Sequence, residues 1–157
     1  MIQRANMDGT GQKALITSDI VWPNSLTIDM ETYTVYWADA KPDFTGIYSM
    51  DYNGKNRRTV FRHENLRHPF SLTIFRNRLY WTDWKVPQIN SCTKNNGSFH
   101  TVRDNINSPM GLVVISSERQ PRGKYVIQYT TSTNRALGVL AEIWGESRRP
   151  LSQPGSI

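Results

Sequence analysis

Two short motifs of the chain place a carboxylate two residues after a tyrosine–tryptophan pair. They consist of Tyr36, Trp37 and Asp39, and of Tyr80, Trp81 and Asp83. Carboxylates in such a setting can transfer protons, bind a metal ion or accept hydrogen bonds within the fold. A metal-binding centre would need further ligands, and Glu31 is the acidic residue that would join them. The motifs by themselves leave these three roles open.

The histidines and the cysteine give little support for catalysis. His63, His68 and His100 are too scattered for a metal-binding motif, and the sequence has no HExxH, G-x-S-x-G or P-loop pattern. Cys92 is the single cysteine, so it has no partner for an intrachain disulfide and is expected to be a small buried residue. We therefore expect that this chain is not an enzyme and that it binds no metal ion or other cofactor.

Length and composition favour one domain of strands and turns. The 157 residues are 38% hydrophobic and 20% charged, which is enough for a core and unlike a disordered chain. No apolar run is long enough for a transmembrane helix, and the first residues lack the apolar stretch of a signal peptide. We therefore expect this fragment to lack both. The net charge of +6 is compatible with nucleic acid, a membrane surface or an acidic protein.

Both motifs lie within a repeat of about 43 residues. The string Ser-Leu-Thr-Ile occurs at Ser25 and again at Ser71, each time two residues after a proline. Turn glycines follow at the same interval, at Gly9, Gly54 and Gly97. Several features that share one period indicate a structural repeat, in which each unit packs on the next.

Each full repeat is predicted to form four strands. In the first repeat the expected strands are residues 25–29, 35–39, 46–52 and 57–61. Their starts lie about ten residues apart with turn residues between them, which is typical of antiparallel hairpins. Asn-Gly in two of the turns predicts positive φ at both central residues. The pattern predicts an all-β fold, a partial β-propeller of about two and a half four-stranded antiparallel blades with an irregular C-terminal tail.

The propeller gives the opening motifs a structural role. Alternation along a strand puts Tyr36 and Ala38 on one face, and Trp37 and Asp39 on the other. The large rings are expected to fill the wedge between neighbouring blades. Asp39 and Asp83 are expected to accept hydrogen bonds from backbone or arginine groups, because a buried carboxylate needs such partners.

These residues resemble the YWTD propeller repeats, also called class B repeats, of the low-density lipoprotein receptor family. The string YWTDW at Tyr80 is the family motif unchanged, and YWADA at Tyr36 is a variant of it. The resemblance covers about residues 1–122 and is strongest to the lipoprotein-receptor-related members. It implies a propeller fragment over residues 1–123, with class B repeats at about residues 34–76 and 78–116.

The resemblance implies an extracellular module of an endocytic receptor. In such receptors cysteine-rich repeats bind ligand with calcium, while the propeller arranges neighbouring growth-factor-like modules and supports ligand binding and release. Partners would be secreted proteins or lipoproteins, reached through the parent receptor at the cell surface. Calcium is expected only in the neighbouring modules, and membrane attachment only through a transmembrane segment outside this chain.

Two other functions remain as alternatives. The first is an intracellular propeller-like scaffold for protein–protein contacts, which would account for the single cysteine. The second is a six-bladed-propeller hydrolase, in which Glu31, Asp39 and Asp83 would have to serve at the central channel. Flanking cysteine-rich modules in the gene would decide for the receptor.

Six arginines form a candidate partner-binding set between residues 57 and 78. They are Arg57, Arg58, Arg62, Arg67, Arg76 and Arg78. Such a set either binds an acidic partner or consists of solvated charges at strand ends and loops. Nucleic acid is not expected, because the aromatic residues that would stack on bases are assigned to blade packing.

Two further residues are candidates for regulation or modification. His68 is a candidate for pH sensing in acidic endosomes, and the alternative is an ordinary loop residue. Asn96 begins the sequon Asn-Gly-Ser on a predicted turn, so N-glycosylation and a coincidental serine are both open.

The chain departs from the family pattern at both ends. The family propeller has six blades, and residues 124–157 contain no cysteine where a cysteine-rich module is expected. We interpret these residues as a tail foreign to the family and disordered, produced by intron read-through; the alternative is a degenerate strand pair. With open blade faces, the isolated chain is expected to be marginally folded or to associate.

Overall fold

The computed structural model describes residues 1–116, 126–131 and 138–142, which form strands in four antiparallel sheets. The first sheet pairs β1 (Ile2–Arg4) with β2 (Lys13–Ile16). The second contains β3 (Pro23–Asp29), β4 (Thr34–Asp39), β5 (Gly46–Asp51) and β6 (Arg58–Phe61). The third contains β7 (Pro69–Phe75), β8 (Arg78–Asp83), β9 (Ile89–Thr93) and β10 (Phe99–Arg103). The fourth contains β11 (Pro109–Ile115), β12 (Val126–Thr131) and β13 (Gly138–Glu142).

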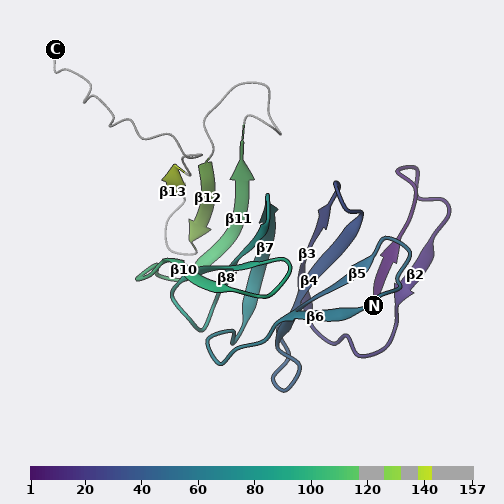
Figure 1. Ribbon diagram of the computed structural model, residues 1–157, viewed down its shortest axis with the longest axis horizontal. Coiled ribbons are helices and arrows are strands. Elements are labelled where there is room, and N and C mark those ends of the chain that lie inside the picture. The colour runs from purple at the N-terminus through teal and green to yellow at the C-terminus, as the bar shows by residue number, and fades with distance from the viewer. Residues whose placement is uncertain (117–125, 132–137, 143–157) are drawn as a thin grey trace, which may run out of the picture.

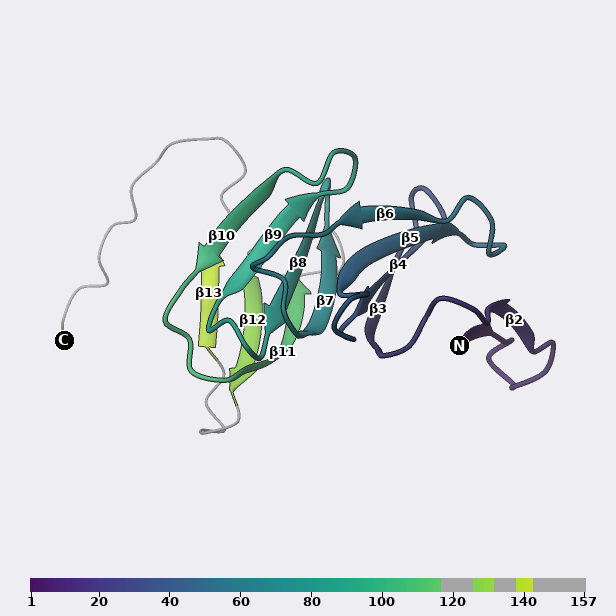
Figure 2. The ribbon, with the colours of Figure 1, turned by 90° about the horizontal axis from the view of Figure 1, so that it is seen from below.

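The sheets are arranged as consecutive blades. Figures 1 and 2 show them following one another in chain order, from β1 and β2 at one side to β11–β13 at the other. The first strands of consecutive blades contact each other, β3 with β7 and β7 with β11. The all-β class and the partial propeller are thereby confirmed. None of the described residues belongs to a helix that could cross a membrane.

The observed strands of the first full blade agree with the predicted ones to within two residues. The largest difference is at β3, which begins at Pro23 instead of Ser25. Proline cannot donate a backbone hydrogen bond, so it is tolerated as the first residue of a strand. The spacing of the hydrophobic residues and the positions of the turn residues therefore predict the strand boundaries well.

Each four-stranded blade has a loop end and a turn end. At the loop end of the β3–β6 blade, Asp39 pairs with Pro23 and Gly46. At the turn end, Thr34 pairs with Asp29 and Asp51. The β4–β5 and β8–β9 loops and the connections into β3 and β7 therefore lie at the loop end. The β3–β4, β5–β6, β7–β8 and β9–β10 turns lie at the turn end.

The expectation for the Asn-Gly turns is wrong in one respect. Of each pair only the glycine has positive φ, 86° at Gly54 and 67° at Gly97. The turns are longer than the two-residue hairpin loops in which both residues are left-handed. The β5–β6 turn is closed by a hydrogen bond from the Asp51 N–H to the Lys55 carbonyl (2.9 Å). The β9–β10 turn is closed by a bond from the Thr93 N–H to the Ser98 carbonyl (3.1 Å), which encloses a longer loop.

Alternation along the motif strands separates each tyrosine from its tryptophan. Trp37 packs in the core between the first and second sheets, and Tyr36 in the core between the second and third. Trp81 shares that second core, while Tyr80 packs against the fourth sheet. Both tryptophans are 0% exposed. The rings thus fill the wedges between blades, where they stabilise the stack by excluding water.

Strands β12 and β13 belong to the range that the sequence analysis assigned to a tail. β12 pairs with β11, and β13 pairs with β12. This pairing corresponds to the strand-pair alternative for the described part of that range. The boundary at residue 123 and the intron read-through stay predictions, and the rest of the tail lies outside the described residues.

Candidate functional site

The Asp39 carboxylate holds the loops at the loop end of the β3–β6 blade. Its Oδ2 accepts a hydrogen bond from the Val21 N–H (2.8 Å), and its Oδ1 accepts bonds from the Trp22 and Lys41 N–H groups (both 3.1 Å). The side chain is 1% exposed. Asp39 therefore joins the segment before β3 to the loop after β4.

Asp83 repeats this arrangement one blade further on. Its carboxylate accepts hydrogen bonds from the Arg67 N–H (2.8 Å) and the His68 N–H (2.9 Å) on one side. On the other side it accepts bonds from the Lys85 (2.9 Å) and Val86 (3.2 Å) N–H groups. These backbone donors occupy the oxygens that a metal ion or a substrate proton would need.

The acids that a channel hydrolase would require are not gathered in one place. Asp39 and Asp83 belong to different blades, and each is enclosed by its own loops. Glu31 follows β3 at the turn end, opposite Asp39 in the same sheet. Within the described residues, no group of three or more histidine, cysteine, aspartate or glutamate side chains is placed to hold a metal ion.

The loops that the two carboxylates hold, together with the start of β7, carry four aromatic side chains, which we call the loop-end aromatic surface. It consists of Trp22, His68, Phe70 and Trp84. The His68 and Phe70 rings stack on Trp84 with centroids 5.3 and 4.5 Å away, and Trp22 is tilted against His68 at 6.5 Å. Trp22 and Trp84 are 49% and 48% exposed. The surface is a nearly continuous run of rings across two blades.

The arrangement of these rings suits the binding of a polypeptide. Half-exposed tryptophans supply large apolar area with few rotatable bonds, and such residues dominate protein interfaces. The same loops carry charges of both signs, with Lys41 and Asp43 in one loop and Glu64 and Arg67 in another, so charge does not select the partner. A polypeptide with an apolar anchor side chain would fit the rings.

Sequence analysis missed Trp22, Phe70 and Trp84, because it assigned the aromatic residues to blade packing. The signal for Trp84 was its place directly after the YWTD motif, where the strand and its alternation end. His68 was singled out and lies half-buried between Trp22 and Trp84. Its role in pH sensing stays a prediction.

The six candidate arginines divide between the two ends of the blades. Four lie toward the turn end, and Arg62 and Arg67 toward the loop end. The Arg62 guanidinium donates to the Asp43 carbonyl (2.7 Å). The Arg67 Nε donates to the Glu64 carbonyl (3.3 Å). The set does not form one basic surface, although partner binding by individual members stays a prediction.

The arginines at the turn end take part in contacts within the fold. Arg57 lies over the Trp37 ring at 5.4 Å and donates to the Ser18 and Asp19 carbonyls. Arg78 donates to the Ser91 hydroxyl (2.9 Å). Two other contacts complete the set: Arg76 lies over the Phe75 ring at 5.2 Å, and Arg58 donates to the Lys94 carbonyl (2.9 Å).

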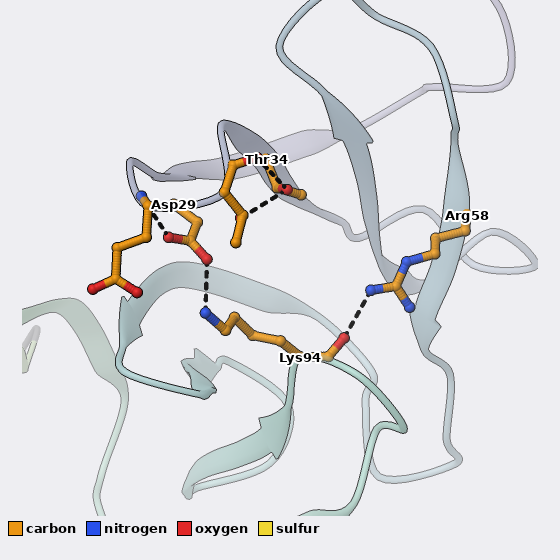
Figure 3. A network of polar contacts seen from close by, with 6 residues as sticks. Asp29, Thr34, Arg58 and Lys94 are labelled. Carbon is orange, nitrogen blue, oxygen red and sulfur yellow. Dashed lines mark hydrogen bonds and ion pairs between the residues drawn. The ribbon is translucent and has the colours of Figure 1, made fainter.

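A buried ion pair joins two blades at the turn end. The Lys94 Nζ lies 2.7 Å from the Asp29 Oδ2, and Figure 3 shows the Lys94 side chain extending to Asp29 from the next blade. The Lys94 carbonyl accepts a hydrogen bond from the Arg58 guanidinium. Burial raises the pKa of Asp29, but hydrogen bonds from Lys94, Thr32 and Glu31 outweigh it and leave that pKa below its usual value. The pair borders an open pocket of about 560 Å³. Sequence analysis did not single out either residue.

The repeated serine of the Ser-Leu-Thr-Ile string links the first strands of consecutive blades. The Ser25 Oγ accepts a hydrogen bond from the Leu72 N–H (2.9 Å) of the next blade. The Ser71 Oγ accepts one from the Leu112 N–H (3.0 Å) in the same way. The repetition of the string in the sequence was the signal for this role.

The remaining candidates are a cysteine, the motif tyrosines and the sequon. Burial raises the pKa of the Cys92 thiol to about 12, so the thiol stays protonated near neutral pH. Burial also raises the pKa of Tyr36 and of Tyr80. Asn96 is exposed in the β9–β10 turn, at the turn end. None of these groups adds to the loop-end aromatic surface.

Comparison with known proteins finds relatives among receptors. The family described as "Low-density lipoprotein receptor repeat class B" matches residues 1–30 and 34–76. "Vitellogenin receptor Yl" of Drosophila melanogaster is 31% identical over 94% of this chain and 7% of its own length. "Vitellogenin receptor" of Solenopsis invicta is 40% identical over 59% and 5%, respectively. "Sortilin-related receptor" of Homo sapiens is 34% identical over 62% and 4%.

A solved structure shares the fold. A chain of the "Crystal structure of Nidogen/Laminin Complex" matches with a TM-score of 0.63 and 18% identity, over 84% of this chain and 52% of that chain. At this identity the likeness shows the fold. The present chain spans 4–7% of the length of the three receptors it matches.

Proposed function

This chain is a propeller module of the receptor family that carries low-density lipoprotein receptor class B repeats, and we propose that its loop-end aromatic surface binds a secreted protein ligand. The parent is an endocytic receptor that displays the module outside the cell, next to cysteine-rich modules. The observation that carries the proposal is the pair of half-exposed tryptophans, Trp22 and Trp84, at 49% and 48% exposure. Their loops are fixed by buried carboxylates, so the surface is formed before a ligand arrives.

The relatives indicate the kind of ligand. Two of them are named vitellogenin receptors, so a vitellogenin is the first ligand to examine. A large secreted protein presents apolar side chains that would pack against the rings of the loop-end aromatic surface. Lipoproteins are the second ligand class that the family relationship suggests.

His68 is the residue through which this contact would respond to acid. Its ring lies between Trp22 and Trp84, with centroids 6.5 and 5.3 Å away. A positive charge on this ring would lie within the aromatic surface and would oppose the burial of an apolar ligand side chain there. A ligand held by apolar contact there would then be released more readily.

The binding test compares two tryptophan variants with a matched aromatic control. The receptor ectodomain that contains this chain is titrated with purified vitellogenin. Trp84→Ala and Trp22→Ala are each expected to raise the Kd about tenfold or more, because central aromatic residues carry most interface energy. Tyr33→Ala removes an aromatic ring that is 62% exposed in the β3–β4 turn, at the turn end, and is expected to leave the Kd unchanged. Wild-type affinity in both tryptophan variants would remove the proposal.

The pH part of the proposal has its own measurement. Ligand release is followed as the pH is lowered to about 5.5, where histidine side chains become protonated. His68→Ala is expected to slow the release, whereas His100→Ala, in β10, is expected to behave like the wild type. Unchanged release in His68→Ala would show that this histidine is an ordinary loop residue, with ligand binding itself unaffected.

The alternative functions have less support. The named relatives are receptors, and the positions of Glu31, Asp39 and Asp83 do not form the acidic centre that a hydrolase needs. An intracellular scaffold would use the same aromatic surface for a cytosolic partner. Cysteine-rich modules encoded beside the chain would exclude the scaffold.

A further inference from the structure

The β9–β10 turn presents Asn96 as an exposed residue whose side-chain oxygen is bound within the turn. The Asn96 Oδ1 accepts hydrogen bonds from the Ser98 N–H (3.1 Å) and from the Thr93 hydroxyl. Within residues 1–116, the hydrogen bonds of this side chain are made through its oxygen. The residue is exposed, so the fold leaves room for a substituent on its side chain.

The fold explains only two of the three residues of the sequon Asn96-Gly97-Ser98. Gly97 has φ of 67°, and a Cβ on it would lie 2.7 Å from the Val60 carbonyl, so the turn requires glycine. Ser98 contributes its backbone groups to the turn and to Arg78. In the preceding blade the residue after the turn glycine is Lys55. Its backbone N–H likewise donates a hydrogen bond within the turn, to the Asp51 carboxylate. The blade architecture therefore does not demand a hydroxyl at Ser98.

We propose that Asn96 is an N-glycosylation site and that its glycan projects from the turn end of the propeller. The donor is a lipid-linked oligosaccharide diphosphate of the secretory pathway. The Asn96 Nδ2 forms a bond to the first sugar carbon, the bond from that carbon to the diphosphate oxygen breaks, and the amide loses one proton. No oxidation or reduction takes place. Ser98 supplies the hydroxyl that makes the asparagine an acceptor.

The position of the glycan separates it from the ligand surface. Thr93 pairs with Arg78 at one end of the β7–β10 blade, whereas Asp83 pairs with Pro69 at the other. The glycan therefore leaves from the end opposite Trp84 and does not cover the loop-end aromatic surface. It would instead shield the turn end, including the pocket beside the Asp29–Lys94 pair.

The test follows the electrophoretic mobility of the chain after it has entered the secretory pathway. The full 157-residue chain is expressed behind a cleavable secretion signal in insect cells, and the product is compared before and after treatment with peptide N-glycosidase. We expect one shift in mobility that the glycosidase removes, with Asn96 converted to aspartate in the mass spectrum of the treated peptide. Glycosylation precedes folding, so this readout does not depend on the stability of the isolated chain.

Three variants identify the site. Asn96→Gln and Ser98→Lys are expected to abolish the shift, and Ser98→Lys keeps a turn compatible with the fold because Lys55 occupies the same place one blade earlier. Ser98→Thr keeps the hydroxyl and is expected to retain the shift. A chain whose signal has been cleaved but that shows no glycosidase-sensitive shift would overturn the proposal. A shift that persists in Asn96→Gln would overturn it as well. Ligand binding plays no part in the assay, so its outcome is separate from that of the tryptophan variants.

Discussion

Asp83 shows how a single side chain can organise a surface without taking part in chemistry. Its carboxylate accepts backbone hydrogen bonds from His68 before β7 and from Lys85 after β8. The two loops are thereby held so that the His68 and Trp84 rings stack. Asp39 does the same for the loop that carries Trp22. The aromatic surface depends on these two acids.

Replacing Asp83 by asparagine tests this dependence. The amide NH2 cannot accept, so backbone N–H groups of the loops would be left buried without a partner. We expect Asp83→Asn to lower the free energy of unfolding by about 2–3 kcal/mol, measured by urea denaturation. Asp104→Asn, at an exposed acid outside the strands, is expected to change it by less than about 0.5 kcal/mol. Equal effects of the two substitutions would contradict the role assigned to Asp83.

Sequence alone predicted the buried part of the site better than the exposed part. Alternation along β4 predicted that Tyr36 and Trp37 lie on opposite faces, because both residues belong to a regular strand. The burial expected for Asp39 predicted that its carboxylate accepts hydrogen bonds. Trp22 and Trp84 lie just outside the strands, where no periodicity constrains a side chain. Their contact with His68 depends on how two blades meet, which local pattern does not encode.

The turn between the third and fourth strands is the element that sets the fit between blades. A Cβ on Gly54 would lie 2.8 Å from the Leu15 carbonyl oxygen, and one on Gly97 would lie 2.7 Å from that of Val60. Gly9, at the same place in the first sheet, has φ of 83° but no atom within 4 Å of such a Cβ among the described residues. The three glycines share a conformation, and only the later two share a close packing contact.

This difference separates the cost of conformation from the cost of packing. Gly9→Ala is expected to lower the free energy of unfolding by about 1 kcal/mol, the cost of a left-handed alanine. Gly54→Ala adds a clash with backbone and is expected to cost at least about 1 kcal/mol more. Thermal and urea denaturation of the two variants measure the difference. Equal losses would mean that the preceding blade does not press against this turn.

The Asp29–Lys94 pair links blades through the same kind of turn. The pKa of Asp29 is held below its ordinary value of 3.8, so its charged form stabilises the folded state. That contribution is complete above pH about 4 and is lost as the pH falls through the folded-state pKa. Endosomal acid should therefore leave this blade contact intact.

Lys94→Met provides the measurement for this pair. It leaves a buried carboxylate without its partner and is expected to cost about 2–4 kcal/mol of unfolding free energy at neutral pH. The deficit relative to the wild type should shrink when urea titrations are repeated below pH about 4, because Asp29 then becomes neutral. Lys85→Met, at an exposed lysine, serves as the control. A deficit that does not change with pH would show that Lys94 acts through packing alone.

The sequence predicted these turns but not their contacts across blades. The repeating glycines fixed the positions of the turns, since a left-handed residue is needed there. The β9–β10 turn encloses one residue more than the β5–β6 turn, as their closing hydrogen bonds show. That longer turn carries Lys94, and the difference was visible only once the strands were paired.

At the scale of the whole molecule, the first full blade has an open side at β3. Leu26 of β3 is 45% exposed, whereas the equivalent Leu72 and Leu112 are 4% and 8% exposed. The isolated chain therefore presents apolar surface and strand edges that favour association. We expect its sedimentation to depend on concentration, and Leu26→Lys to reduce that dependence. A monodisperse monomer with a sharp thermal transition would contradict this expectation.

The most direct test of the account is where a ligand protects the propeller from hydrogen–deuterium exchange. The receptor ectodomain is labelled with and without purified vitellogenin, and peptides from the two ends of the blades are compared. The account predicts slower exchange in residues 20–24, 67–70 and 83–87 at the loop end, and no change in residues 30–34, 52–57 and 94–98 at the turn end. Protection confined to the turn-end peptides, with the loop-end peptides unchanged, would contradict it.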